Sequence, residues 1–136
     1  MPHRVFVYGT LKRGFPNHGL MRAATFIDTA LTVERYPMIL QGRGYSPVMM
    51  PEPGNGHRIV GEVWEVDDAQ LVVLDDLEST HLPTGYIRET IAVETPAGTI
   101  SAFVYFKPRG RVTIVHSEPH ADYQHRGYIP PELRQP

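Results

Sequence analysis

The stretch VFVYGTLKRG (residues 5–14) is an apolar, strand-like run that ends at Gly9, beside a tyrosine and a threonine. Gly9 has no Cβ, so the chain can turn sharply there and a ligand can approach the main chain closely. A strand that ends in this way can present bare backbone N–H groups to a carboxylate or a phosphate. The alternative is a strand followed by an ordinary loop or hairpin, since glycine often ends a strand.

The composition bounds the size and class of the protein. With 136 residues the chain has the length of one domain, and a domain of this size can bury a substantial core. The 13 prolines and 12 glycines exceed average usage and indicate many turns. We therefore expect strands more than long helices.

Charge and cysteine content exclude several classes of partner and site. The formal net charge of −2 predicts no broad basic surface, so we expect neither nucleic acid nor a membrane as a partner. The chain has no cysteine, which excludes disulfides, thiolate metal sites and a cysteine nucleophile. The N-terminal residues lead directly into the first strand without a signal peptide or membrane span, so we expect a soluble cytoplasmic protein.

Strand-forming sequence recurs along most of the chain. Segments rich in β-branched and aromatic residues predict strands at 4–8, 26–35, 38–41, 59–66, 86–94, 99–106 and 111–115. The turn at residues 95–98 predicts a hairpin, in which Ile91 and Val93 alternate with Ala92 and Glu94 across the two faces. Antiparallel strands joined by short turns indicate a small barrel or a strongly curled sheet.

One clear helix is predicted at about residues 68–77. Asp67 is a candidate N-cap, and Gln70 stands three residues later, at the capping-box position. At about 100° per residue, one arc of the helix is apolar. Its members are Leu71, Val73, Leu74 and Leu77.

Glu78 falls within this apolar arc if the helix reaches it, whereas Asp75 lies just outside and Asp76 points to solvent. A carboxylic acid in an apolar site loses hydration of its charged form, which raises its pKa and suits it to proton transfer near neutral pH. Glu78 is therefore a candidate general acid and base. The alternative is that the helix stops at Leu77 and leaves Glu78 solvated.

The remaining segments are expected to be less regular. A second, short helix is predicted at residues 18–24, and the proline- and glycine-rich segment 45–57 predicts a loop that can act as a lid over a pocket. The polar segment 116–136 is irregular, but Tyr123 and Tyr128 indicate that it packs on the body of the protein.

No motif predicts a metal or a cofactor. His116, His120 and His125 lack the spacing of a metal site, and we interpret them as tail and surface residues. The chain has neither a Walker loop nor a dinucleotide fingerprint, so no cofactor is expected. Tyr105 has two interpretations: ordinary packing of a strand aromatic, or a hydroxyl in a pocket.

An ordered set of motifs resembles the γ-glutamylcyclotransferase-like superfamily, and within it the γ-glutamylamine cyclotransferase branch. The resemblance spans about residues 4–106. Its motifs are VFVYGTLKRG at 5–14, PNH at 16–18, GEVWEV at 61–66, LDDLE at 74–78 and FVY at 103–105. The chain departs from the pattern at Ser79, where many superfamily members have glycine; the γ-glutamylamine branch tolerates serine.

The resemblance implies an α+β fold, a small mixed and mostly antiparallel β-barrel with flanking short helices, as a single domain over residues 1–136. It implies one catalytic residue, Glu78, and a substrate-binding set of Tyr8, Gly9, Thr10, Leu11 and Tyr105. The amides of the loop would hold the α-carboxylate of a γ-glutamyl group, and Glu78 would move protons. The substrate's own α-amine would attack its γ-carbonyl, giving 5-oxoproline and a free amine without metal or cofactor.

The implied partner is a small γ-glutamyl compound such as γ-glutamyl-ε-lysine, and we expect a monomer. Three alternatives stay open. They are a cyclotransferase for another γ-glutamyl substrate, a non-catalytic module that binds a small carboxylate, and a structural interaction protein without a pocket. The segment 43–57, which would line the amine side of the pocket, carries no readable specificity.

Overall fold

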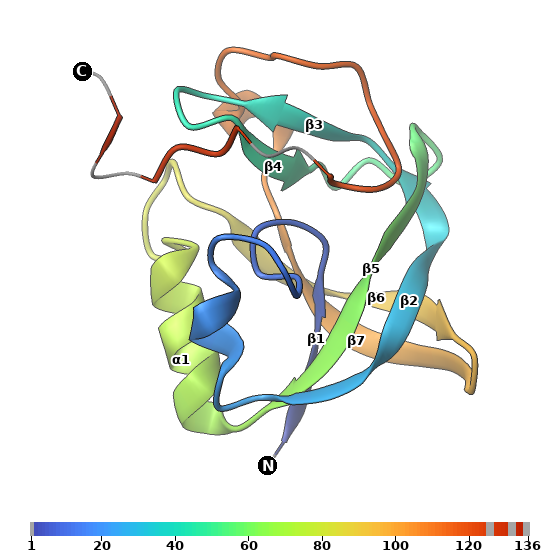
Figure 1. Cartoon of the computed structure of the whole chain (residues 1–136). Helices are drawn as coiled ribbons and strands as arrows, with labels where there is room; N and C mark the ends of the chain where they lie inside the picture. Colours follow the sequence, from blue (N-terminus) through green and yellow to red (C-terminus); the bar gives the residue numbers. More distant parts are fainter. Residues whose placement is uncertain (1, 125–126, 131–132, 135–136) are drawn as a thin grey trace.

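Five strands form a closed barrel in the computed structural model of the chain, which describes residues 2–124, 127–130 and 133–134 (Figure 1). Round the barrel the order is β1 (His3–Val7), β5 (His57–Val66), β2 (Thr25–Tyr36), β6 (Ile87–Thr95) and β7 (Gly98–Phe106). The β1–β7 pair is parallel and the other pairs are antiparallel. The predicted mixed, mostly antiparallel barrel with short flanking helices is confirmed.

The hairpin of β6 and β7 shows how the sequence builds the barrel. Thr95 pairs with Gly98, so the strands are joined by the predicted two-residue turn. Ile91 and Val93 are buried while Ala92 is exposed, because alternate side chains of a strand face opposite sides. The inward side chains of the barrel form a continuous apolar core.

Helix α1 (Asp68–Leu77) has its predicted bounds and its predicted cap, since the Asp67 side chain accepts a hydrogen bond from the Gln70 N–H. The short helix predicted at 18–24 is instead a 3₁₀ helix, η1 (His18–Met21). Figure 1 draws η1 beside α1, where the Gln70 side chain donates to the Leu20 carbonyl at 2.5 Å. These two elements cover one flank of the barrel.

The prediction that residues 45–57 form a loop is wrong in part. Strand β4 (Ser46–Met49) pairs with β3 (Met38–Gln41) as a two-stranded sheet beside the barrel. Pro47 is tolerated because proline, which cannot donate a ladder hydrogen bond, fits an edge strand. The apolar side chains of Val48 and Met49 are completely buried and stabilise the strand.

The strand predicted at residues 111–115 is absent from the described structure. A second 3₁₀ helix, η2 (Arg109–Arg111), comes first, and only an isolated bridge joins Val115 to Gln41. Thr113 donates to the Gln41 side chain from both its N–H and its hydroxyl. The segment does bond to the edge of β3, since the Gly42 N–H donates to the Ile114 carbonyl and the His116 N–H donates to the Leu40 carbonyl. Regular pairing does not extend further, because the Thr113 N–H is taken by the Gln41 side chain.

The C-terminal segment packs on the body of the protein, as predicted. Figure 1 shows it passing over β3 and β4, and the His120 N–H donates to the Met38 carbonyl. Tyr123 is completely buried in the barrel core. Lys12, from the opening motif, donates from Nζ to the Asp122 carboxylate and to the Tyr123 carbonyl, both at 2.9 Å.

Replacing Lys12 by methionine is expected to lower the free energy of unfolding by about 1–3 kcal/mol, because it removes the buried, charged hydrogen bond from Lys12 to the Tyr123 carbonyl. Methionine keeps an apolar stem of similar length. Denaturant unfolding measures the loss, and Asp122→Asn is the matched control, with a smaller loss because that carboxylate is partly exposed. An unchanged midpoint for Lys12→Met would contradict this role.

Candidate active site

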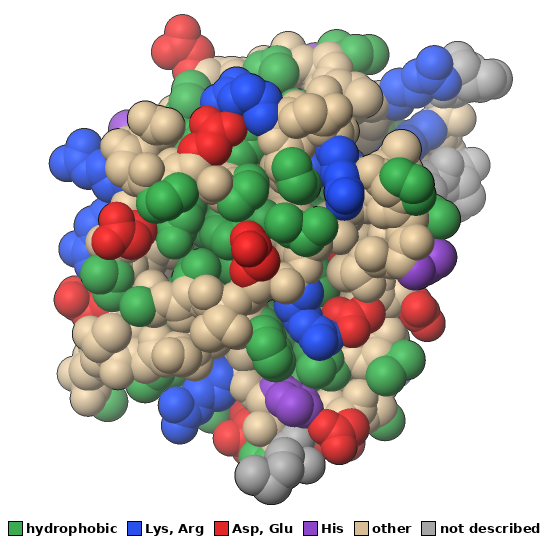
Figure 2. Space-filling view, turned by 180° about the vertical axis from the view of Figure 1, so that it is seen from behind, with side chains coloured by type: hydrophobic (Ala, Val, Ile, Leu, Met, Phe, Trp, Pro, Cys, Tyr) green, Lys and Arg blue, Asp and Glu red, His purple; other side chains and the backbone are tan. Residues whose placement is uncertain are grey.

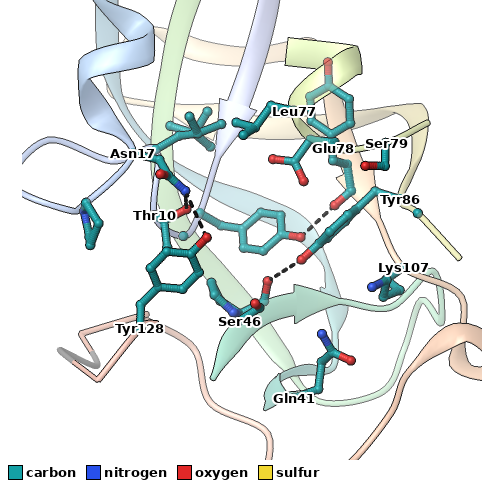
Figure 3. Close-up of a pocket in the computed structure, with 18 of the residues that line it drawn as sticks. Thr10, Asn17, Gln41, Ser46, Leu77, Glu78, Ser79, Tyr86, Lys107 and Tyr128 are labelled. Carbon is teal, nitrogen blue, oxygen red and sulfur yellow. Dashed lines mark hydrogen bonds between the residues drawn. The ribbon is translucent and has the colours of Figure 1, made fainter. Parts of the chain in front are cut away.

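A pocket of about 630 Å³ lies where the end of β1, the C-terminal end of α1, β4 and the end of β7 meet (Figure 3). The C-terminal segment closes one side through Tyr128, Pro130 and Arg134. The structure brings all six predicted site residues to the wall of this pocket: Tyr8, Gly9, Thr10, Leu11, Glu78 and Tyr105.

The turn after β1 holds three backbone amides without an internal acceptor. The carbonyls of this turn are used, since Lys12 N–H donates to Gly9 O at 3.0 Å and Asn17 N–H donates to Thr10 O at 2.9 Å. Among the described residues, the N–H groups of Gly9, Thr10 and Leu11 have no hydrogen-bond acceptor. Successive free amides of this kind suit an anion.

Gly9 is required for a reason that the sequence does not reveal. A Cβ at this position would lie 2.6 Å from Cγ of Pro47, which packs directly against the glycine. The open side of Gly9 is therefore filled by β4. Glycine here allows the close approach of a second strand, whereas the sequence predicted the close approach of a ligand.

The hydroxyl groups of Tyr8 and Tyr105 already have partners in the protein. Tyr8 donates to the Tyr105 carbonyl at 2.7 Å and accepts from the Met49 N–H at 3.2 Å, so it ties β1 to β7 and β4. Tyr105 donates to Asp75 at 2.8 Å, and Arg88 donates to the other oxygen of that carboxylate at 2.6 Å. Burial raises the pKa of both tyrosines. The two rings thus form pocket wall and framework.

Glu78 ends helix α1 as its C-cap. Its N–H donates to the Leu74 carbonyl and its own carbonyl accepts from the Tyr86 N–H, both at 3.0 Å, so its backbone is fixed on both sides. Burial raises the pKa of its carboxyl from 4.5 to about 7, and the nearby positive charge of Lys107 opposes this rise. The carboxyl can therefore both accept and return a proton near neutral pH.

The geometry differs from both sequence interpretations of Glu78. The helix stops at Leu77, as the alternative had it, yet Glu78 lies in the pocket and is only partly accessible to solvent. The apolar arc is also narrower than predicted, since Leu71 and Leu74 are buried but Val73 is 45% exposed. The helix end, rather than the helix face, places the carboxyl.

The polar residues of the pocket that were not predicted as site residues include Tyr86, Lys107 and Asn17. The Tyr86 hydroxyl donates to the Pro47 carbonyl at 3.1 Å, and Lys107 Nζ lies 4.9 Å from the centre of the Tyr86 ring. The Asn17 side chain donates to the Thr10 hydroxyl at 2.8 Å. Asn17 belongs to the PNH motif at 16–18, so the sequence offered a reason to propose it as a site residue. Tyr86 and Lys107 lie next to the ends of predicted strands, and no local motif marked them as site residues.

The histidine cluster of the tail serves local packing where it is described. His116 stacks on Tyr45 with ring centres 4.1 Å apart, His120 donates to the Glu118 carbonyl, and His125 lies outside the described residues. Within the described ranges, no three His, Asp or Glu side chains are grouped as a metal site would require.

The face in Figure 2 mixes lysine and arginine with aspartate and glutamate, with no broad field of one sign among the residues described there. None of the helices in the described part of the chain is long and apolar enough to span a membrane.

The family model described as "Gamma-glutamyl cyclotransferase, AIG2-like" matches residues 5–126, so the chain belongs to this family of cyclotransferase enzymes. Relatives include the Gamma-glutamylaminecyclotransferase of Bos taurus, 39% identical over 128 residues, which cover 90% of this chain and 76% of the bovine protein. The Homo sapiens protein of the same name is 40% identical over 118 residues, which cover 74% of this chain and 76% of the human protein.

Solved structures agree with the family assignment. The crystal structure of an AIG2-like protein from Mus musculus matches with a TM-score of 0.85 and 33% identity, covering 98% of this chain and 99% of the mouse chain. A solution structure named A2LD1 matches with a TM-score of 0.74 and 32% identity, covering 97% of this chain and 99% of that chain.

Proposed function

We propose that this chain is a γ-glutamylamine cyclotransferase, which converts a γ-glutamyl amine such as γ-glutamyl-ε-lysine to 5-oxoproline and the free amine. One observation carries the proposal: a carboxyl with a pKa of about 7 shares a pocket with three free backbone amides. The named activity of the bovine and human relatives supports the same substrate class.

The amides of Gly9, Thr10 and Leu11 would bind the substrate's α-carboxylate. Hydrogen bonds from N–H groups to an ionised acceptor are stronger than neutral ones, so this contact can fix one end of the glutamyl group. The hydrogen bonds from Asn17 to Thr10 hold the turn in place. The binding set proposed here is the predicted one, with Tyr8 and Tyr105 acting through their rings.

Glu78 would take a proton from the substrate's α-ammonium group. The freed amine then attacks the γ-carbonyl carbon, forming the C–N bond of the five-membered ring. As the tetrahedral intermediate collapses, Glu78 gives its proton to the leaving nitrogen and the original amide C–N bond breaks. The ring nitrogen then loses its second proton to the ionised Glu78 or to the released amine, which leaves the neutral lactam. Because both reacting groups belong to one molecule, holding the folded conformer can lower the barrier by roughly 7–11 kcal/mol.

Release of 5-oxoproline from a panel of γ-glutamyl compounds tests the function directly. The panel contains γ-glutamyl-ε-lysine, γ-glutamyl alkylamines, a γ-glutamyl α-amino acid and glutathione, and chromatography quantifies the product. We expect γ-glutamyl-ε-lysine and the γ-glutamyl alkylamines to be turned over faster than the γ-glutamyl α-amino acid and glutathione. Tight binding of 5-oxoproline with no turnover of any compound would favour a carboxylate-binding module instead.

The pH dependence of kcat/KM is expected to show an acid limb with an apparent pKa near 7. Glu78 must be ionised to accept a proton, so activity rises as the pH passes its raised pKa of about 7. Steady-state rates between pH 5 and 8.5 measure the limb. Lys107→Met should move it to higher pH, because Lys107 lowers the pKa of Glu78; a limb near 4.5 would contradict the assignment.

We further propose that residues 1–136 act as a single monomeric domain in the cytoplasm. Size-exclusion chromatography with light scattering tests the oligomeric state, and a dimer mass would overturn the monomer.

A further inference from the structure

The pocket carries more positive charge than a γ-glutamyl group alone requires. Among the described residues that line it, Lys107 and Arg134 are the cations and Glu78 is the one acid. The backbone amides of residues 9–11 already provide a site for the glutamyl carboxylate. Lys107 lowers the pKa of Glu78, but neither of the two cationic side chains has an assigned contact with the substrate.

Lys107 lies away from the amide turn. Figure 3 draws Lys107 and Gln41 on the side of the pocket opposite Thr10 and Asn17. The Lys107 backbone N–H donates to the Met49 carbonyl at 2.9 Å, so the start of the side chain is fixed against β4. Within the described part of the chain, no carboxylate lies within ion-pair distance of its ammonium group.

Arg134 lies on the wall formed by the C-terminal segment, where its guanidinium is 5.6 Å from the centre of the Tyr128 ring. Its Nη2 donates to the Ser46 hydroxyl at 3.3 Å and its Nε donates to the Ile129 carbonyl at 2.9 Å. The guanidinium packs so closely over Gly44 that a Cβ there would overlap it, and the Ile129 N–H donates to the Gly44 carbonyl. As with Lys107, none of the described carboxylates pairs with Arg134.

The local electrostatics agree with an anion site. The pKa of Lys107 is lowered by burial, and the positive charges of Arg134 and Arg111 lower it further, while Glu78 opposes them. Placing like charges together in a partly buried site is unfavourable unless an anion compensates them. A bound carboxylate would supply that charge and accept hydrogen bonds from both side chains.

We propose that Lys107 and Arg134 bind a carboxylate on the leaving amine, so that the preferred substrates are γ-glutamyl amines whose amine part itself carries a carboxylate. This inference rests on the proposed function. It assigns the two ends of the pocket to different parts of one substrate: the amide turn to the glutamyl group, and the cationic end to the amine.

Two synthetic substrates isolate the carboxylate. γ-Glutamyl-6-aminohexanoate and γ-glutamyl-pentylamine have the same linkage and the same alkyl chain, and only the first carries the terminal carboxylate. We expect wild-type kcat/KM to favour the first by about 10- to 100-fold, the range typical of hydrogen bonds to charged groups. Equal kcat/KM values for the two substrates would overturn the proposal.

Variants then assign the preference to residues. Lys107→Met and Arg134→Met should each reduce the ratio of the two kcat/KM values toward one. Arg109→Met is the matched control, because Arg109 pairs with Glu52 on the surface outside the pocket, and it should keep the wild-type ratio. If a variant lowers kcat/KM equally for both substrates, the replaced residue acts in chemistry or folding, and its proposed role in discriminating the two substrates is overturned.

The proposed function and this inference fail in different ways. If neither compound releases 5-oxoproline, the proposed function fails, and isothermal titration calorimetry of the two compounds still tests the cationic end. Tighter binding of the carboxylate compound would support the site, and equal affinity would overturn it.

Discussion

Replacing Glu78 by glutamine is expected to lower kcat for 5-oxoproline release by about 10²- to 10⁴-fold, the usual contribution of a general acid and base. Glutamine has nearly the same shape, so the pocket and the amide turn stay in place and KM changes little. The loss therefore falls on the chemical step. Product release from γ-glutamyl-ε-lysine under saturating conditions measures it.

Asp76→Asn is the matched control for this variant. It makes the same carboxylate-to-amide change on the same helix, but Asp76 is exposed. We expect its kcat to match that of the wild type. If Glu78→Gln also keeps kcat within a few-fold of the wild type, another group moves the protons and the role assigned to Glu78 is wrong.

The same variant should be more stable than the wild type above neutral pH. Because burial raises the folded-state pKa of Glu78 from 4.5 to about 7, the folded protein binds this proton more tightly than the unfolded chain does. The carboxyl thus favours folding below about pH 4.5, and this contribution is lost as the pH rises through about 7. Removing the buried charge should raise the free energy of unfolding at pH 8 by up to about 3 kcal/mol. Thermal unfolding of both proteins at pH 5 and pH 8 measures the difference.

Local pattern indicated where the parts of the site that depend on local structure lie, although it left an ordinary turn at Gly9 and a solvated Glu78 as alternatives. The glycine at the end of the first strand marks the turn with free amides, and the helix with its Asp67 cap leads directly to Glu78. Both features follow from backbone rules that act within a few residues. Alternating apolar residues and short turns indicated a small barrel or a strongly curled sheet, and the family resemblance implied the barrel.

Contacts between distant segments could not be predicted from local pattern. Pro47 fills the space beside Gly9. The Tyr105 hydroxyl donates a hydrogen bond to Asp75, so Tyr105 both lines the pocket and supports the surrounding structure. Whether residues 111–115 would pair regularly with β3 likewise depended on a distant side chain, since the Thr113 N–H and hydroxyl donate to the Gln41 side chain. Secondary-structure propensity describes which conformation a segment favours, but it does not say which neighbouring strand or side chain will bond to that segment.

The turn after Glu78 has a left-handed backbone at Ser79, the position where many superfamily members have glycine. Ser79 has φ of 54°, in the left-handed region that glycine adopts without steric cost. This conformation brings the Ser79 carbonyl against Gly85, and the Leu82 N–H donates to the same carbonyl at 2.9 Å. Residues 78–86 therefore form a closed loop, and its geometry fixes where Glu78 points.

Replacing Gly85 by alanine is expected to lower kcat/KM by about 100-fold and the free energy of unfolding by about 1–3 kcal/mol. A Cβ on Gly85 would overlap the Ser79 carbonyl oxygen and lie 3.0 Å from the Glu78 carbonyl oxygen. These are backbone atoms, so they cannot yield as the end of a flexible side chain does. The loop must shift, and a displacement of about 1 Å in a catalytic group can cost about 100-fold in rate.

Gly19→Ala is the matched control, since Gly19 has open space around its Cβ position and no left-handed φ. It should keep both activity and stability. Steady-state kinetics and denaturant unfolding of the two variants separate steric displacement from a general effect of losing a glycine. If Gly85→Ala keeps wild-type kcat/KM, the position of Glu78 does not depend on the closed loop. A loss of stability with full activity would lead to the same conclusion, because the carboxyl would then keep its place while the packing of the loop is disturbed.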